Sequence, residues 1–301
     1  MVEPFLKTRC LFGLISQAQH ACMQVFRQLP KLEHVEVGIC KRIDHPDTTT
    51  TNTFIKRWGR DVITHENPAC VEDPTMNLAW ASGVIIQTIS GKVKSLHLSA
   101  ANLVELSRLT YEQHNIPYNP TRNLLFVTNL TLDIRGIHGT HHSMPDWYAV
   151  PRATTKMVEY WAKTINSMPK LVHLQLNGKF GSVINIHQDH IGYALGRLLS
   201  RVKRPLQSLS LHNFDMNVYH LLGYLPAFKS SLKSLVLDRI LMLYCDDIEE
   251  EPWLTLATWA EDHMQGTRIT ANYPCNNMVR VSKFSLKEMS AMGMQVTGWE
   301  F

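Results

Sequence analysis

The stretch MPKLVHLQLNGKF, residues 168–180, contains the pattern that decides the fold. Leu171 is followed, after two variable residues, by Leu174 and Leu176, which flank Gln175. Successive side chains of a β-strand point to opposite faces, so Leu174 and Leu176 share one face and Gln175 points to the other. This spacing predicts a strand with one apolar face and one polar face.

The same apolar pattern occurs in five further segments of the chain. They are LPKLEHVEVGIC (29–40), KVKSLHLSAANL (92–103), FVTNLTLDIRGI (126–137), RPLQSLSLHNFDM (204–216) and SSLKSLVLDRILM (230–242). One such unit cannot bury its apolar face alone, whereas stacked units form a continuous core. The pattern is typical of the strand half of a leucine-rich repeat.

The outward positions of these predicted strands are polar throughout, except at Gly38 and Val236. Chance apolar runs would not place polar residues so regularly on one face. We therefore predict that the ladder of outward side chains binds a protein partner. The candidate binding residues are His34, Glu36, Ser95, His97, Asn129, Thr131, His173, Gln175, Ser208, Ser210, Ser234 and Asp238.

Amphipathic helical patterns, with apolar residues at three- and four-residue steps, precede the strands. They cover residues 14–29, 80–85, 157–165, 191–202, 218–225 and 254–264, and the last leads to a possible seventh strand at 268–272. This alternation predicts an α/β solenoid, a horseshoe with parallel strands on the concave face and helices on the convex face. We expect a single domain over 1–301, with an N-terminal helix at 1–28, six repeats at 29–242 and a degenerate repeat and cap at 243–301.

The repeats are unequally spaced because insertions interrupt them near residues 44–74, 111–122 and 136–152. Long loops in a compact fold are usually functional or disordered. Exposed aromatic side chains in such loops are common anchors for a partner. The insertions therefore supply three further binding candidates, Tyr118, Trp147 and Tyr148.

Histidines in one insertion suggest an alternative function. His138, His141 and His142 lie within five positions of one another. Neutral imidazole is a good zinc ligand, so the alternative is a metal-dependent hydrolase built on the His138–His142 loop. This Gly-bearing loop does not fix a further ligand, and we favour a surface loop without a metal.

Two other charged segments have structural interpretations. In HQDH (187–190), Asp189 is expected to cap a helix that begins near Ile191. The acidic run at 246–251 lacks the ligand spacing of a calcium loop and is interpreted as a solvated loop before the last helix. The basic segment RLLSRVKR (197–204) has apolar residues at helical spacing and is interpreted as a solvated helix face.

Composition narrows the functional classes. The net charge of +4 without a strongly basic segment argues against nucleic acid binding. Six scattered cysteines without a C-x-x-C pair predict reduced thiols. The absence of a sustained signal-peptide core and of a transmembrane-length apolar run predicts a cytoplasmic or nuclear protein that does not bind a membrane. No phosphate-binding, nucleophile or zinc-protease motif occurs, so we expect neither enzymatic activity nor a cofactor.

The segments MPKLVHLQL, PLQSLSLHNF and SLKSLVLDRI, with their irregular spacing and tryptophan-bearing helices, resemble the repeat region of fungal F-box/leucine-rich-repeat proteins. In that family an F-box docks on the adaptor of a cullin–RING ubiquitin ligase, and the repeats hold the protein to be ubiquitinated. The resemblance thus implies a substrate-recognition role. Leu29-Pro30 already belongs to the first repeat, and only 28 residues precede it. No residue here takes over adaptor binding, which would require an F-box upstream.

Overall fold

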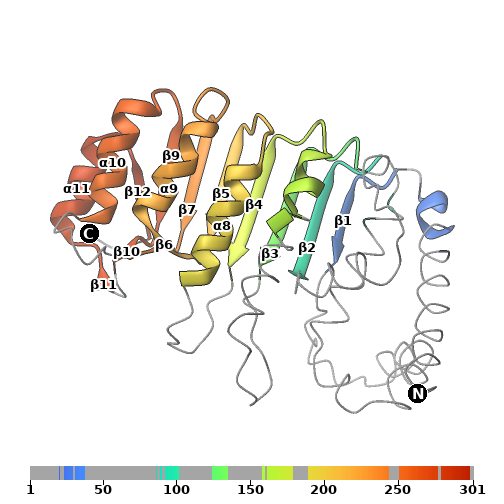
Figure 1. Ribbon diagram of the computed structural model, residues 1–301, viewed down its shortest axis with the longest axis horizontal. Coiled ribbons are helices and arrows are strands. Elements are labelled where there is room, and N and C mark those ends of the chain that lie inside the picture. Colours follow the sequence, from blue (N-terminus) through green and yellow to red (C-terminus); the bar gives the residue numbers. More distant parts are fainter. Residues whose placement is uncertain are drawn as a thin grey trace, which may run out of the picture.

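The computed structural model describes residues 20, 24–29, 31–37, 86, 89, 92–101, 124–134, 158–159, 161–178, 189–243, 251–276 and 279–298. These residues form a mixed α/β structure around an eight-stranded parallel sheet (Figure 1). The predicted α/β class and parallel strands are confirmed.

Each of the six predicted leucine patterns forms one strand of this sheet. These six are β1 (His34–Val37), β2 (Ser95–Ala101), β3 (Asn129–Ile134), β4 (His173–Gly178), β5 (Ser208–His212) and β7 (Ser234–Asp238), and the sheet continues with β9 (Arg268–Asn272) and β12 (Gln295–Thr297). Every strand pairs with its neighbours in the order in which they occur along the chain. The possible seventh strand at 268–272 is therefore present as β9. The eighth strand, β12, was missed by the sequence pattern because it is only three residues long.

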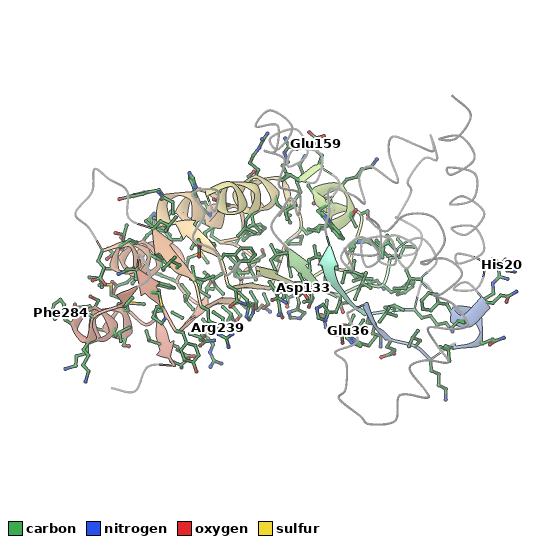
Figure 2. The ribbon with its side chains drawn as sticks, turned by 90° about the horizontal axis from the view of Figure 1, so that it is seen from below. His20, Glu36, Asp133, Glu159, Arg239 and Phe284 are labelled. Carbon is green, nitrogen blue, oxygen red and sulfur yellow. The ribbon has the colours of Figure 1, made fainter. Side chains whose placement is uncertain are left out.

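Helices cover one face of the sheet, as Figures 1 and 2 show. They are α8 (Asp189–Arg201), α9 (Val218–Tyr224), α10 (Pro252–His263) and α11 (Lys283–Ala291), with a short 3-10 helix, η3 (Leu225–Ala227), after α9. Residues 161–166 are also helical, and Trp161 is fully buried there. The helix expected to begin near Ile191 is α8, which begins at Asp189.

The core lies between the helices and the sheet. Register pairs the inward residues Val35, Leu96, Leu130, Leu174, Leu209, Leu235 and Ile269 into one continuous row. All members of this row are buried, at 9% exposure or less. Leu98, Leu132, Leu176, Leu211, Leu237 and Ala271 form a second buried row. Removal of this apolar surface from water is the main force that holds neighbouring units together.

The turns that lead into the strands repeat one backbone arrangement. A single carbonyl oxygen accepts two consecutive N–H groups from the next unit, at 2.8–3.1 Å, in five successive turns. The accepting carbonyls belong to Glu33, Lys94, Thr128, Val172 and Gln207. The turns that lead into the strands therefore line one edge of the sheet, and their backbone geometry is the same from β1 to β7.

The turns that follow the strands also share one backbone conformation. Asn213, Arg239, Tyr273 and Gly298 follow β5, β7, β9 and β12 and have φ between 51° and 93°. The N–H of Asn213 donates to the Asp238 carbonyl at 2.9 Å, and the N–H of Arg239 donates to the Asn272 carbonyl at 2.8 Å. Left-handed φ is costly for residues with a Cβ. The N–H of Tyr273 likewise donates to the Thr297 carbonyl at 3.0 Å, and these hydrogen bonds between neighbouring turns offset the cost at all three residues.

Beyond these turns lies a second, smaller sheet. It contains β6 (Asp215–Asn217), β8 (Leu241–Leu243), β10 (Cys275–Asn276) and β11 (Val279–Arg280), in the order β11-β10-β8-β6. Cys275 carries a thiol whose Sγ donates to the Tyr273 carbonyl at 3.6 Å. The other five cysteines lie outside the described residues.

Asp215 in β6 gives a pH-dependent prediction. Its Oδ1 is buried and accepts no hydrogen bond from the described residues, and burial raises the pKa of the carboxyl above its ordinary value of 3.8. The folded state therefore binds this proton more tightly than the unfolded chain does, and stability falls as pH rises through the raised pKa. Asp215→Asn should stabilise the protein at pH 7 by about 0.5 kcal/mol, a small gain because water still screens part of the group.

Urea unfolding of the wild type and Asp215→Asn at pH 7 and near pH 4 measures this gain. We expect the difference in free energy of unfolding to shrink towards pH 4, where the aspartate itself becomes protonated. A gain of the same size at both pH values would show that ionisation of Asp215 does not cause it.

Candidate functional site

The face of the eight-stranded sheet opposite the helices presents the outward side chains, and we call it the polar face. In Figure 2, Glu36, Asp133 and Arg239 lie on this side of the sheet, whereas Glu159 lies on the helix side. None of the described outward side chains is buried. All twelve residues predicted as binding candidates lie on the polar face, since they alternate with the buried inward rows.

Register aligns these side chains into rows that run across the strands. The first row contains His34, Ser95, Asn129, His173, Ser208, Ser234 and Arg268. The second contains Glu36, His97, Thr131, Gln175, Ser210, Val236, Thr270 and Gln295. The third contains Asp133, Asn177, His212, Asp238, Asn272 and Thr297.

A side-chain network connects the first four strands, and we call it the β1–β4 network. The His97 ring lies between two carboxylates, with Nδ1 3.3 Å from Glu36 Oε1 and Nε2 3.2 Å from Asp133 Oδ1. Asn177 Nδ2 donates to Asp133 Oδ1 at 2.7 Å, and Gln175 Nε2 donates to Asn177 Oδ1 at 2.9 Å. These contacts fix the positions of five polar side chains that come from segments far apart in the sequence.

A second network connects β5, β7 and β9, and we call it the β5–β9 network. His212 Nδ1 lies 3.1 Å from Asp238 Oδ2, and Arg239 Nε lies 4.0 Å from the same oxygen. The Arg239 guanidinium also lies over the Tyr273 ring, with its carbon 5.8 Å from the ring centroid. Arg239 and Tyr273 are both exposed, so this pair presents charge and aromatic surface at the end of the strands.

Small side chains lie between the two networks. Ser208 and Ser210 on β5 pair in register with Ser234 and Val236 on β7, and all four are partly exposed. The first and second rows of the polar face therefore carry small side chains on β5 and β7, and the third row of the same strands carries His212 and Asp238 of the β5–β9 network.

Several of these residues could not be predicted from the sequence pattern. Arg239 and Tyr273 lie one position beyond their strands, where the alternating pattern stops and the backbone turns left-handed. Gln295 and Thr297 belong to β12, for which the alternation of Met294 and Val296 was the available signal. Asp133, Asn177 and His212 occupied predicted outward positions, but their hydrogen-bond partners depend on register between strands.

Other sequence-based hypotheses fall outside the described residues. The His138–His142 loop and the aromatic candidates Tyr118, Trp147 and Tyr148 are among them. In the part of the chain that the structure describes, no three His, Cys, Asp or Glu side chains gather as metal ligands do. Within that same part, no helix has the length and apolar character needed to span a bilayer.

Glu251 is the one residue of the acidic run that is described. It precedes α10 but its side chain does not cap that helix. Its Oε1 instead accepts a hydrogen bond from Asn276 Nδ2 at 2.9 Å, and its Oε2 accepts one from the buried Ser285 hydroxyl. Glu251 thus connects the start of α10 to β10 and α11, which is a structural role rather than the solvated one expected.

Comparisons with known proteins do not assign this chain to a class of proteins. The chain matches no family model, no curated protein and no solved structure. The class that the structure defines is an α/β protein with a parallel sheet, one face covered by helices and the other carrying polar side chains.

Proposed function

We propose that this chain is a leucine-rich-repeat solenoid whose polar face binds another protein. Three features support the solenoid: strands paired in chain order, one buried leucine row shared by successive units, and the same backbone hydrogen bonds at each starting turn. In a solenoid each unit contacts its neighbours, and the stacked strands form an extended binding surface.

The observation that carries the binding proposal is the fixed arrangement of polar side chains across strands. Within the β1–β4 network, His97, Asp133 and Asn177 hold one another through hydrogen bonds and ion pairs. Side chains that are already ordered lose less conformational entropy on binding, so a partner gains affinity from them.

The same geometry supports a binding role without catalysis. General-base catalysis requires an imidazole nitrogen directed at the proton of a nucleophile. Each ring nitrogen of His97 instead faces a carboxylate oxygen, at 3.3 Å and 3.2 Å. We therefore propose that His97 organises the polar face and does not act as a base.

A matched pair of double variants tests the proposal. His173→Glu with Ser210→Glu places two negative charges on the first and second rows of the polar face. His173 is exposed and Ser210 is partly exposed. His220→Glu with Ser200→Glu makes the same chemical changes at exposed positions on α9 and α8. The measurement is quantitative affinity capture from cells of the source organism. The first variant should recover at least about tenfold less of any partner of the polar face, because buried like charges at an interface cost several kcal/mol.

Partners that the helix-face variant retains and the polar-face variant loses would support the proposal. Equal recovery with both variants would contradict it, provided that circular dichroism shows both to be folded. From the resemblance to fungal F-box/leucine-rich-repeat proteins we propose, more specifically, the substrate-recognition part of a ubiquitin ligase receptor. In that case the full-length protein should also recover the ligase adaptor, and equally with both variants, since the adaptor would not contact the polar face.

A further inference from the structure

The edge of the sheet where the strands begin carries a run of positive charge that the polar face does not share. Five successive turns line this edge, at residues 92–94, 124–128, 167–172, 202–207 and 228–233, where the arrows of β2, β3, β4, β5 and β7 begin in Figure 1. They contain seven cationic residues and no Asp or Glu. We call this the basic edge, formed by Lys92, Lys94, Lys170, Lys203, Arg204, Lys229 and Lys233.

Acidic residues lie at both ends of the basic edge. At one end Lys94 Nζ lies 2.6 Å from Glu33 Oε1 in the turn before β1. At the other end Glu261 and Asp262 lie at the end of α10, before β9. The opposite ends of the strands carry Asp133 and Asp238, and Asp215 lies beyond them in β6. The five turns of the basic edge therefore gather positive charge, although the net charge of the chain is only +4.

A hollow at the middle of the basic edge brings together cations from two helical units. It is lined by Lys163, Asn166, Ser167, Lys203 and Arg204, and no carboxylate is among these residues. Asn166 holds the arrangement: its Oδ1 accepts from the Lys203 N–H at 2.8 Å and its Nδ2 donates to the Arg201 carbonyl at 2.9 Å. The Arg204 guanidinium donates to the Asn166 carbonyl, at 2.9 Å from Nε.

These contacts assign different roles to the three cations. Arg204 satisfies a carbonyl at the end of the 161–166 helix, as basic residues at helix C-termini commonly do. Lys163 and Lys203 are both exposed, and their ammonium groups form no ion pair with a described residue. The hollow is thus a rigid frame with two ammonium groups available to an anion.

Apolar surface adjoins the same edge. Leu125 and Phe126, in the turn before β3, are 41% and 45% exposed. Lys170 Nζ lies 4.3 Å from the centroid of the Phe126 ring and covers one of its faces. Nucleic acid binding without sequence preference uses a series of open aromatic faces on which bases stack. A single, partly covered ring beside an exposed leucine fits a protein segment that combines carboxylates with aliphatic side chains.

We propose that the basic edge binds an acidic segment of a protein partner, and that the segment's carboxylates enter the hollow at Lys163 and Lys203 while its apolar side chains cover Leu125 and Phe126. Neighbouring strands are about 4.8 Å apart, so the edge from β2 to β7 spans about 19 Å, the length of about six extended residues. This surface is separate from the polar face, and binding to either does not require the other.

Fluorescence anisotropy with a defined probe tests this proposal. The probe is a labelled Glu-rich peptide of about ten residues with leucine at every third position, and the comparison ligand is single-stranded oligothymidylate of about the same charge. The test variant is Lys203→Glu with Lys233→Glu. The control variant, Lys283→Glu with Lys287→Glu, makes the same charge change at exposed positions on α11.

We expect saturable peptide binding that weakens about tenfold in the test variant and less than about twofold in the control, and that is lost in high salt. Ser210→Glu, in the second row of the polar face, should bind the peptide as the wild type does. Equal weakening in the test and control variants, tighter binding of oligothymidylate than of peptide, or no saturable binding would each overturn the proposal. If the test variant does not fold, Lys203→Gln with Lys233→Gln replaces it, with an expected weakening of about threefold.

Discussion

Leu209→Ala is expected to lower the free energy of unfolding by about 3 kcal/mol, among the largest effects that a single substitution in this chain can have. Leu209 is the second residue of β5 and has no exposed surface. It belongs to the continuous inward row and pairs in register with Leu174 on β4 and Leu235 on β7. Alanine would leave a cavity shared by three units, and close-packed neighbours relax only partly to fill it.

Urea unfolding followed by circular dichroism measures this loss. The control is Ser210→Ala, which changes the adjacent residue on the opposite face of the same strand and should alter stability by less than about 0.5 kcal/mol. If the two substitutions cost the same, β5 does not present Leu209 to the core, and the register across the sheet is wrong.

Gly178→Ala is expected to destabilise the protein by about 2–3 kcal/mol, although alanine is only one methyl group larger. Gly178 ends β4, against the turn that follows β5. A Cβ at this position would lie 2.2 Å from the Asn213 carbonyl oxygen and 2.9 Å from Phe214 Cδ1. Asn213 is itself held by its hydrogen bond to Asp238 and by its left-handed φ of 58°. The backbone on both sides of the clash is therefore fixed, and one unit must shift relative to the next.

Gly223→Ala provides the matched control. Gly223 lies in α9, and a Cβ there would meet no atom within 4 Å. Since alanine is a better helix former than glycine, this substitution should raise the free energy of unfolding by about 0.5–1 kcal/mol. Opposite signs for the two Gly→Ala substitutions would support the close approach of β4 to the next turn. A neutral Gly178→Ala would show that this approach does not occur.

Much of the core could be predicted from the sequence because alternation is a local property. Leu174 and Leu176 face the core whatever strand lies beside them, and the same holds for Leu209 and Leu211. The strand β9 could also be predicted, since Ile269 and Ala271 follow an amphipathic helix. The strand β12 could not be predicted, because an alternation over three residues is too short to be distinguished from chance.

The alternation of residues alone predicts which side of each strand is apolar and which is polar, because the period of a strand depends only on the backbone. The contacts between polar side chains depend on how the strands are aligned in the folded protein. Glu36, His97 and Asp133 are separated by insertions and come together because register aligns β1, β2 and β3. The basic edge has the same origin: its lysines are scattered along the chain, and parallel strands that all begin at one edge gather them there. Long-range alignment of this kind depends on packing between units, which no local pattern contains.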